Sequence, residues 1–207
     1  MPRLQKSVQQ FFAHSREEWR VWLERNHTTS KGIWLVYNKK TSGKHHLSYD
    51  EQVEEALCFG WVDSRPGKLD DERSMLYFAP RKAKSGWSKP NKERVEKLIK
   101  AGLMAPAGLA KIEAAKKDGS WTKLDAVERL EVPPDLARAL AKVENAEANF
   151  AAFPRSVKRA ILEWIAQAKK PETRAKRIEE TARLAGQNLR ANQWRQSLES
   201  RGSGARP

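Results

Sequence analysis

Between residues 61 and 94, carboxylate, hydroxyl, indole, amide and cationic side chains follow one another closely enough to form a binding rim. WVDS, residues 61–64, places a carboxylate and a hydroxyl at the end of an apolar run, and YFAPRK, residues 77–82, ends in two cations. SGWSKPN, residues 85–91, is typical of a helix start, whose free amide groups favour an anion. We therefore predict an anion- or ligand-binding rim made of Trp61, Asp63, Ser64, Arg81, Lys82, Trp87, Ser88, Asn91 and Arg94.

The same residues also fit a purely structural interpretation. Asp63 and Arg81 would then form an ion pair, Ser88 would only cap its helix, and Trp61 and Trp87 would only pack in the core. Both interpretations use the same residue types, so the geometry of the folded chain must separate them. The most informative observation would be whether Asp63, Arg81, Trp87 and Asn91 line one accessible pocket.

The sequence contains no motif of a known catalytic, cofactor or metal site. The four histidines, His14, His27, His45 and His46, are not spaced with cysteines or carboxylates as a zinc site requires. GxGxxG, Walker, GxSxG and HExxH sequences do not occur. The single cysteine, Cys58, lies on the apolar side of a predicted helix, and we expect it to be buried and unreactive. We therefore predict no catalytic residues, no metal and no cofactor.

Helices and strands alternate around this rim. Ser15 and Ser48 each precede a glutamate by three residues, a spacing that predicts the start of a helix. GIWLVYNKK and SMLYFAPRK are rich in β-branched and aromatic residues and predict strands. Gly60 ends the second helix, and the chain is expected to continue as a strand from there.

The connection between WVDS and SMLYFAPRK predicts a hairpin with its turn at Pro66-Gly67. After residue 85 the apolar spacing becomes helical. The predicted fold class is therefore α+β: a small, mainly antiparallel sheet with covering helices over residues 1–125, followed by a basic helical segment over residues 126–190. The Gly/Ser-rich tail, residues 191–207, is predicted to be disordered.

The chain is strongly basic, with 40 Lys and Arg against 26 Asp and Glu and a formal net charge of +14. The excess is greatest in the last quarter, where an apolar stripe of Val157, Ile161, Trp164 and Ile165 is expected to be buried. Such a field attracts nucleic acid or other anionic partners, although a charged helix surface can also be merely solvated. The candidate basic surface consists of Lys169, Lys170, Arg174, Lys176 and Arg177.

Neither an export signal nor a membrane anchor is recognisable. MPRLQKSVQQFF has basic residues but lacks the apolar segment of a signal peptide. No window approaches the roughly 18 apolar residues of a spanning helix. A single cysteine also fits a reducing compartment. We therefore expect a cytoplasmic protein.

Six longer motifs follow one another along the chain: FFAHSREEWRVWLERNH, GIWLVYNKK, LSYDEQVEEALCFGWVDS, YFAPRKAKSGWSKPNKERVEKLIKAGLM, AGLAKIEAAKKDGSW and ILEWIAQAKKPETRAKRIEE. In this order they resemble the motifs of the bacterial YdeI/OmpD-associated, or bacteriocin-protection, family. The resemblance covers about residues 11–186, and implies an N-terminal domain with a YjbR/CyaY-like fold and a helical C-terminal segment. It also implies an association with bacteriocin or antimicrobial-peptide tolerance, but no catalytic residue.

Three functions remain open from the sequence. The first is a non-enzymatic protein that supports bacteriocin or stress tolerance by binding an anionic ligand or a protein partner. The second is a nucleic-acid-binding protein that uses Trp87 and its basic C-terminal helices, which predicts an affinity that falls steeply with salt. The third is a small-molecule enzyme with a tryptophan-lined pocket around Asp63 and Arg81, which predicts a carboxylate with a perturbed pKa. The sequence does not predict an oligomeric state.

Overall fold

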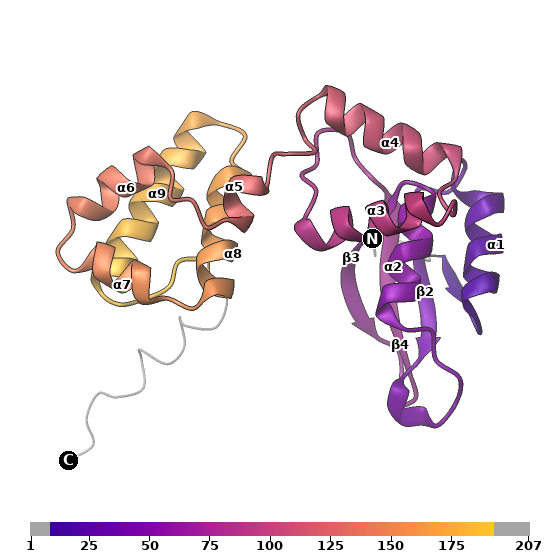
Figure 1. The fold of residues 1–207 in the computed structure, drawn as a ribbon. Helices are drawn as coiled ribbons and strands as arrows, with labels where there is room; N and C mark the ends of the chain where they lie inside the picture. The colour runs from indigo at the N-terminus through magenta and orange to yellow at the C-terminus, as the bar shows by residue number, and fades with distance from the viewer. Residues whose placement is uncertain (1–8, 193–207) are drawn as a thin grey trace, which may run out of the picture. The chain divides into compact units, whose positions relative to one another are not determined.

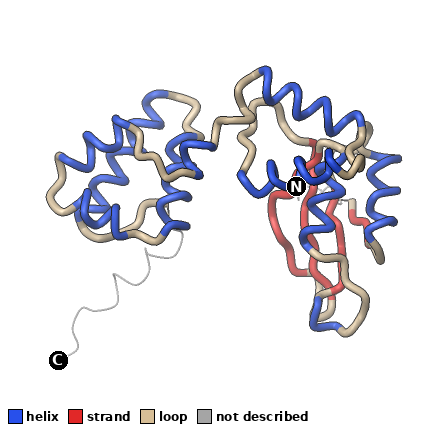
Figure 2. The backbone as a smooth tube through the Cα atoms, viewed as in Figure 1, coloured by secondary structure: helices blue, strands red, loops and turns tan. Residues whose placement is uncertain are grey.

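The computed structural model describes residues 9–192, and the chain divides after Lys123 into two compact units. Each unit has its own hydrophobic core. The first unit contains a sheet and several helices, whereas the described part of the second contains only helices and loops (Figures 1 and 2).

The first unit is α+β, as the sequence predicts. Its four-stranded sheet has the order β1-β2-β4-β3, with β1 parallel to β2 and the other two pairs antiparallel. The three-residue strand β1 was not predicted, because it is too short to give a period-two pattern. The elements are β1 (Gln10–Phe12), α1 (Arg16–Asn26), β2 (Ile33–Asn38), the 3-10 helix η1 (Lys40–Ser42), α2 (Tyr49–Cys58), β3 (Trp61–Lys68), β4 (Arg73–Pro80), α3 (Lys89–Lys100) and α4 (Pro106–Lys117).

The predicted turn at Pro66-Gly67 is wrong. Both residues lie within β3, which continues to Lys68 beyond an irregular register between Asp63 and Pro66. Proline is tolerated there because β3 is an edge strand of the sheet, where a missing amide donor costs little. The chain turns later, where the Asp70 carboxylate accepts a 2.6 Å hydrogen bond from the amide of Arg73.

Helix α2 is the centre of the helical layer, in contact with β3, α1, α3 and α4 (Figure 1). Ser48 begins it with a complete capping box, in which the Ser48 and Glu51 side chains each accept a hydrogen bond from the other residue's amide. Trp19, on α1, is fully buried, and its indole donates a 3.0 Å hydrogen bond to the carbonyl of Gln52 on α2. Cys58 is fully buried, which confirms the predicted burial of this residue.

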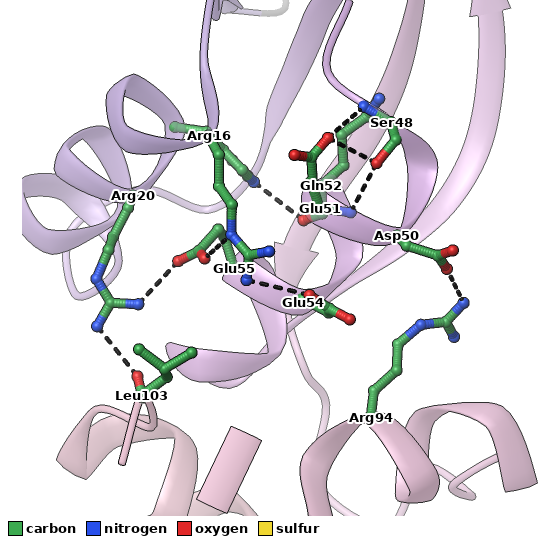
Figure 3. A network of polar contacts seen from close by, with 11 residues as sticks. Arg16, Arg20, Ser48, Asp50, Glu51, Gln52, Glu54, Glu55, Arg94 and Leu103 are labelled. Atoms are coloured by element: carbon green, nitrogen blue, oxygen red, sulfur yellow. Dashed lines mark hydrogen bonds and ion pairs between the residues drawn. The ribbon is translucent and has the colours of Figure 1, made fainter. Parts of the chain in front are cut away.

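A buried carboxylate joins α1 to α2 (Figure 3). Glu55, on α2, is 2% exposed and accepts hydrogen bonds from Arg16 Nε at 2.6 Å and Arg20 Nη1 at 2.8 Å. Arg20 also donates to the carbonyl of Leu103, 3.0 Å away in the loop that leads to α4. One carboxylate thereby fixes the helix whose C-terminus leads through Gly60 to β3.

The second unit is built from five described helices around a separate apolar core. Val157, Ile161 and Ile165 are buried as predicted, whereas Trp164 is only half-buried, because it lies on the edge of the stripe. The helices are α5 (Asp125–Glu128), α6 (Pro134–Ala141), α7 (Ala146–Ala152), α8 (Arg155–Ala166) and α9 (Pro171–Gly186).

The predicted disordered tail, residues 191–207, lies outside the described residues except for Ala191 and Asn192, and Ala191 is buried. Among the helices that the structure describes, none combines the length and the apolar character needed to cross a bilayer.

Candidate anion-binding site

The loop between β4 and α3, residues 81–88, encloses a small cavity of about 60 Å³ together with α4 and the turn that follows it. The amide of Arg81 donates a 2.9 Å hydrogen bond to the carbonyl of Gly60, so the start of the loop is held against the end of α2. The polar and charged side chains that line the cavity are Arg81, Lys82, Lys84, Ser85, Lys111, Asp118 and Ser120.

Arg81 is the buried cation of this cavity. Only 6% of the residue is exposed, and its guanidinium carbon lies 3.8 Å from the ring centroid of Trp87. One terminal nitrogen donates to the carbonyl of Gly86. The Nε atom is buried without a hydrogen-bond partner among the described residues. The stacking and the bond to Gly86 fix the plane of the guanidinium while leaving one of its donors unsatisfied.

The electrostatic environment of Arg81 is unfavourable for a cation. Burial lowers the pKa of Arg81 to about 10, and the negative charge of Asp63 offsets only part of this effect. The group is still protonated at neutral pH, because that pKa lies well above 7. A buried cation with an unpaired donor costs free energy until an anion approaches it.

Three lysines and one carboxylate complete the charge of the lining. Lys82 and Lys84 come from the loop and Lys111 from α4, whereas Asp118 follows α4. The Asp118 carboxylate accepts a 2.9 Å hydrogen bond from the amide of Ser120, and hydrogen bonds with Ser120 lower its pKa. The described lining therefore carries four cations against one anion, an arrangement that attracts negative charge.

Gly60 allows Lys111 to reach this region. Its backbone has φ of +72°, and a Cβ atom there would lie 2.5 Å from Cγ of Lys111. Any other residue would therefore be strained in its backbone and would collide with the lysine stem. The glycine that ends α2 also makes room for a cation from α4.

Three other predicted rim residues, Asp63, Asn91 and Arg94, make hydrogen bonds outside the cavity. Tyr49 donates a 3.0 Å hydrogen bond to Asp63 Oδ2, and burial together with the charge of Asp63 raises the pKa of Tyr49 to about 12. Arg94 donates to Asp50 Oδ1 at 2.5 Å and to Asn91 Oδ1 at 3.2 Å; the bond to Asp50 is drawn in Figure 3. The Arg94–Asp50 bond ties α3 to the start of α2, and the Tyr49–Asp63 bond ties the start of α2 to β3.

The structure thus separates the predicted rim. Arg81, Lys82 and Trp87 line the cavity, whereas Asn91 and Arg94 are not among its lining residues. Within the described residues, no hydrogen bond or ion pair joins Asp63 to Arg81, although the two charges interact at longer range.

The three remaining rim residues have simpler environments. Trp61 is 1% exposed and its indole donates to the carbonyl of His27 at 3.2 Å, so it belongs to the core. Ser64 is exposed and donates a long, 3.4 Å hydrogen bond to the carbonyl of Tyr77. Ser88 occupies the N-cap position of α3, but its side chain makes no capping hydrogen bond.

Sequence reasoning missed Lys111, Asp118 and Ser120, which lie about 30 residues or more after Arg81. Their pattern alone predicts only a helix and its end. A usable signal was Gly108 inside that helix, since an interior glycine often marks a close approach. A Cβ atom at Gly108 would lie 2.2 Å from the carbonyl oxygen of Cys58, so α4 packs directly on α2.

The predicted basic surface of the second unit lies around the turn between α8 and α9. Lys169, Lys170 and Lys176 are exposed. Arg174 instead pairs with Asp135 at 2.7 Å, and Arg177 donates to the carbonyl of Trp164 while lying 4.9 Å from its ring centroid. Both arginines therefore hold α9 to its neighbours as well as adding charge. No cluster of three or more metal-ligating side chains occurs among the residues that the structure describes.

Residues 129–188 match a family described as "Bacteriocin-protection, YdeI or OmpD-Associated". The chain carries a YdeI/OmpD-associated domain. This YdeI/OmpD-associated domain contains helices α6 to α9 and the basic turn. Residues 11–111 match a domain of unknown function (DUF8412), so the YjbR/CyaY-like character of the first unit stays a prediction. Comparisons with curated proteins and with solved structures gave no match.

Proposed function

We propose that the protein is a non-enzymatic binding protein that holds an anionic group of its ligand or partner in the Arg81 cavity and supports tolerance of bacteriocins or antimicrobial peptides. The link to tolerance is supported by the YdeI/OmpD-associated domain at residues 129–188, whose family description includes bacteriocin protection. The binding role is supported by the cavity in the first unit.

The observation that carries the proposal is the unpaired Nε of Arg81. Buried polar groups in folded proteins almost always have a hydrogen-bond partner, and an exception calls for a ligand, a water or a functional explanation. An anion in the cavity would accept this hydrogen bond and compensate the buried charge at the same time. Asp63 does not fill this role: its Oδ2 accepts a hydrogen bond from Tyr49, and no hydrogen bond joins it to Arg81 among the described residues.

The side chains around the cavity favour binding over covalent chemistry. Ser85 Oγ donates a 2.7 Å hydrogen bond to the carbonyl of Lys82, and no base activates it within the described residues. Cys58 lies outside the lining, and burial raises the pKa of its thiol to about 11, which opposes thiolate formation at neutral pH.

The binding part of the proposal is tested by thermal melting of the full chain in chloride, acetate, sulfate and phosphate at equal ionic strength. A ligand that binds only the native state stabilises it by RT ln(1 + [L]/Kd). We expect one or more of these anions to raise the melting temperature of the parent protein. Arg81→Lys should lose this rise, and Lys100→Gln, which removes an exposed charge at the end of α3, should keep it. No rise with any anion would contradict the proposal.

The link to tolerance is tested in bacteria that lack the gene. The parent chain should restore survival in a bacteriocin or cationic peptide, and Arg81→Lys should restore it less well at equal protein abundance. Equal survival with and without the parent gene would contradict the assigned role in tolerance, even if anion binding were observed.

A further inference from the structure

The charge of the Arg81 cavity exceeds what a monocarboxylate can balance. Among the described lining residues, the buried Arg81 and the exposed Lys82, Lys84 and Lys111 stand against one carboxylate, the exposed Asp118. The hydrogen bonds that Asp118 shares with Ser120 keep that carboxylate ionised, and three positive charges remain in excess. A dianion therefore gains more from this site than a monoanion.

The donors also suit an anion with several oxygen atoms. Arg81 offers a planar Nε–H held in place by the Trp87 ring, whereas the lysines reach the cavity on flexible stems from the loop and from α4. A fixed guanidinium donor combined with mobile ammonium groups suits a tetrahedral oxyanion, whose oxygens point in different directions.

The size of the cavity excludes a large ligand from its interior. Its volume of about 60 Å³ is far below the roughly 300–1,000 Å³ of pockets that enclose whole organic ligands. Trp87 is 1% exposed, covered by Arg81 on one side and 5.0 Å from the ring centroid of Trp121. The indole therefore has no free face on which a nucleic-acid base could stack.

From the charge, the donors and the size we infer that this cavity binds a phosphate group, either as inorganic phosphate or as the terminal group of a small phosphate monoester. The inference rests on the proposed function, because it names the class of anion held at the same site. The phosphate would accept the Nε–H of Arg81, and any remainder of a monoester would extend past the lysines into solvent.

The test is calorimetric titration of the full chain at constant ionic strength with inorganic phosphate, glycerol 3-phosphate, sulfate, acetate and a ten-residue oligothymidylate. Inorganic phosphate and the monoester together establish the shared group, and the ratio of their affinities shows which source the site prefers. We expect both to bind at least tenfold more tightly than acetate.

Comparing the affinities at pH 5.5 and pH 7.5 distinguishes binding of a phosphate dianion from general attraction to a basic protein. The second proton of a phosphate monoester leaves with a pKa near 6, whereas sulfate keeps the same charge across this range. Arg81, with its pKa of about 10, stays protonated between pH 5.5 and 7.5, and the lowered pKa of Asp118 keeps that carboxylate ionised. Monoester affinity should therefore rise at least threefold from pH 5.5 to pH 7.5, while sulfate affinity stays constant.

Two site variants and one control assign the binding to this cavity. Arg81→Lys keeps a positive charge but removes the planar Nε donor, and Lys111→Gln keeps most of the stem that crosses Gly60 while removing its charge. Each should weaken monoester binding at least tenfold, with Lys100→Gln unchanged. Lys111→Gln also keeps the test valid if Arg81→Lys does not fold, which melting curves will show.

The possible failures are distinguishable. Acetate affinity equal to phosphate affinity, with both lost in Arg81→Lys, overturns the phosphate inference but leaves the proposed anion binding standing. If phosphate binds but neither Arg81→Lys nor Lys111→Gln weakens the binding, the assignment of phosphate to this cavity is overturned. Binding of oligothymidylate without binding of the monoester also overturns the inference, and no binding by any anion overturns the proposed function with it.

Discussion

Replacing Glu55 by glutamine should remove the strongest polar link between α1 and α2. The Glu55 carboxylate accepts hydrogen bonds from Arg16 Nε at 2.6 Å and from Arg20 Nη1 at 2.8 Å (Figure 3). The Glu55 side chain is 3% exposed. Burial alone would lower the pKa of both arginines, but the contacts with Glu55, together with Glu54 for Arg16 and Cys58 for Arg20, raise it overall. Glutamine has nearly the same shape, but it is neutral and directs an NH₂ group toward one of the guanidinium groups.

The expected loss in the free energy of unfolding follows from the two hydrogen bonds that Glu55 accepts. Each hydrogen bond to a charged group contributes about 1.5–3 kcal/mol, so the pair would give about 3–6 kcal/mol if both partners were fully buried. The side chains of Arg16 and Arg20 are each 30% exposed, and water can replace part of the lost interaction. We therefore expect Glu55→Gln to lower the free energy of unfolding of the first unit by about 2–4 kcal/mol.

Urea unfolding followed by tryptophan fluorescence measures this change, because six of the eight tryptophans lie before residue 124. Glu54→Gln is the matched control, since Glu54 also pairs with Arg16, at 3.1 Å, but its side chain is 24% exposed. The control should cost less than about 1 kcal/mol, as exposed ion pairs do. Equal losses in the two variants, or a loss below about 1 kcal/mol in Glu55→Gln, would refute this interpretation of the buried carboxylate.

Three further predictions concern packing. Cys58 is fully buried and its thiol pKa is raised to about 11, so a thiol reagent should label it only after unfolding; rapid labelling of the native chain would show that α2 opens. Gly108→Ala places a Cβ atom 2.2 Å from the carbonyl oxygen of Cys58 and should cost about 1–3 kcal/mol in urea unfolding, a result that an unchanged midpoint would contradict. Ile161→Ala, at a position with 0% exposure, should destabilise the second unit by about 2–5 kcal/mol, as measured by circular dichroism at 222 nm, and a neutral result would mean that the core around α8 is loosely packed.

Local signals predicted those parts of the fold that depend on a few adjacent residues. Ser48 begins α2 with a capping box, and Gly60 ends it with a positive φ, because both effects are decided within one turn of helix. The turn at Pro66-Gly67 failed because a proline-glycine pair is compatible with an edge strand as well as with a turn. Only the pairing of β3 with β4 distinguishes the two.

The sequence predicted only those residues of the candidate site that lie in a single segment of the chain. Arg81 and Trp87 are six residues apart in one loop, and the structure brings them into contact. Lys111 joins them through the packing of α4 on α2, a long-range contact that leaves no periodic trace. Strand pairing alone predicts Asp63 beside Arg81, but it does not predict the contact with Tyr49 on α2, whose hydroxyl donates a hydrogen bond to the Asp63 carboxylate.

The most direct measurement of the central claim is the nuclear magnetic resonance signal of the Arg81 Nε–H during titration with glycerol 3-phosphate. Nitrogen-15 spectra of the full chain would report the side-chain Nε–H of each arginine, with assignment from Arg81→Lys. We predict that the Arg81 signal and the indole signal of Trp87 shift together and saturate, because the anion accepts the donor that the folded chain leaves unpaired. An Arg81 signal that stays unchanged while the ligand binds elsewhere, or that does not respond at any concentration, would contradict the account.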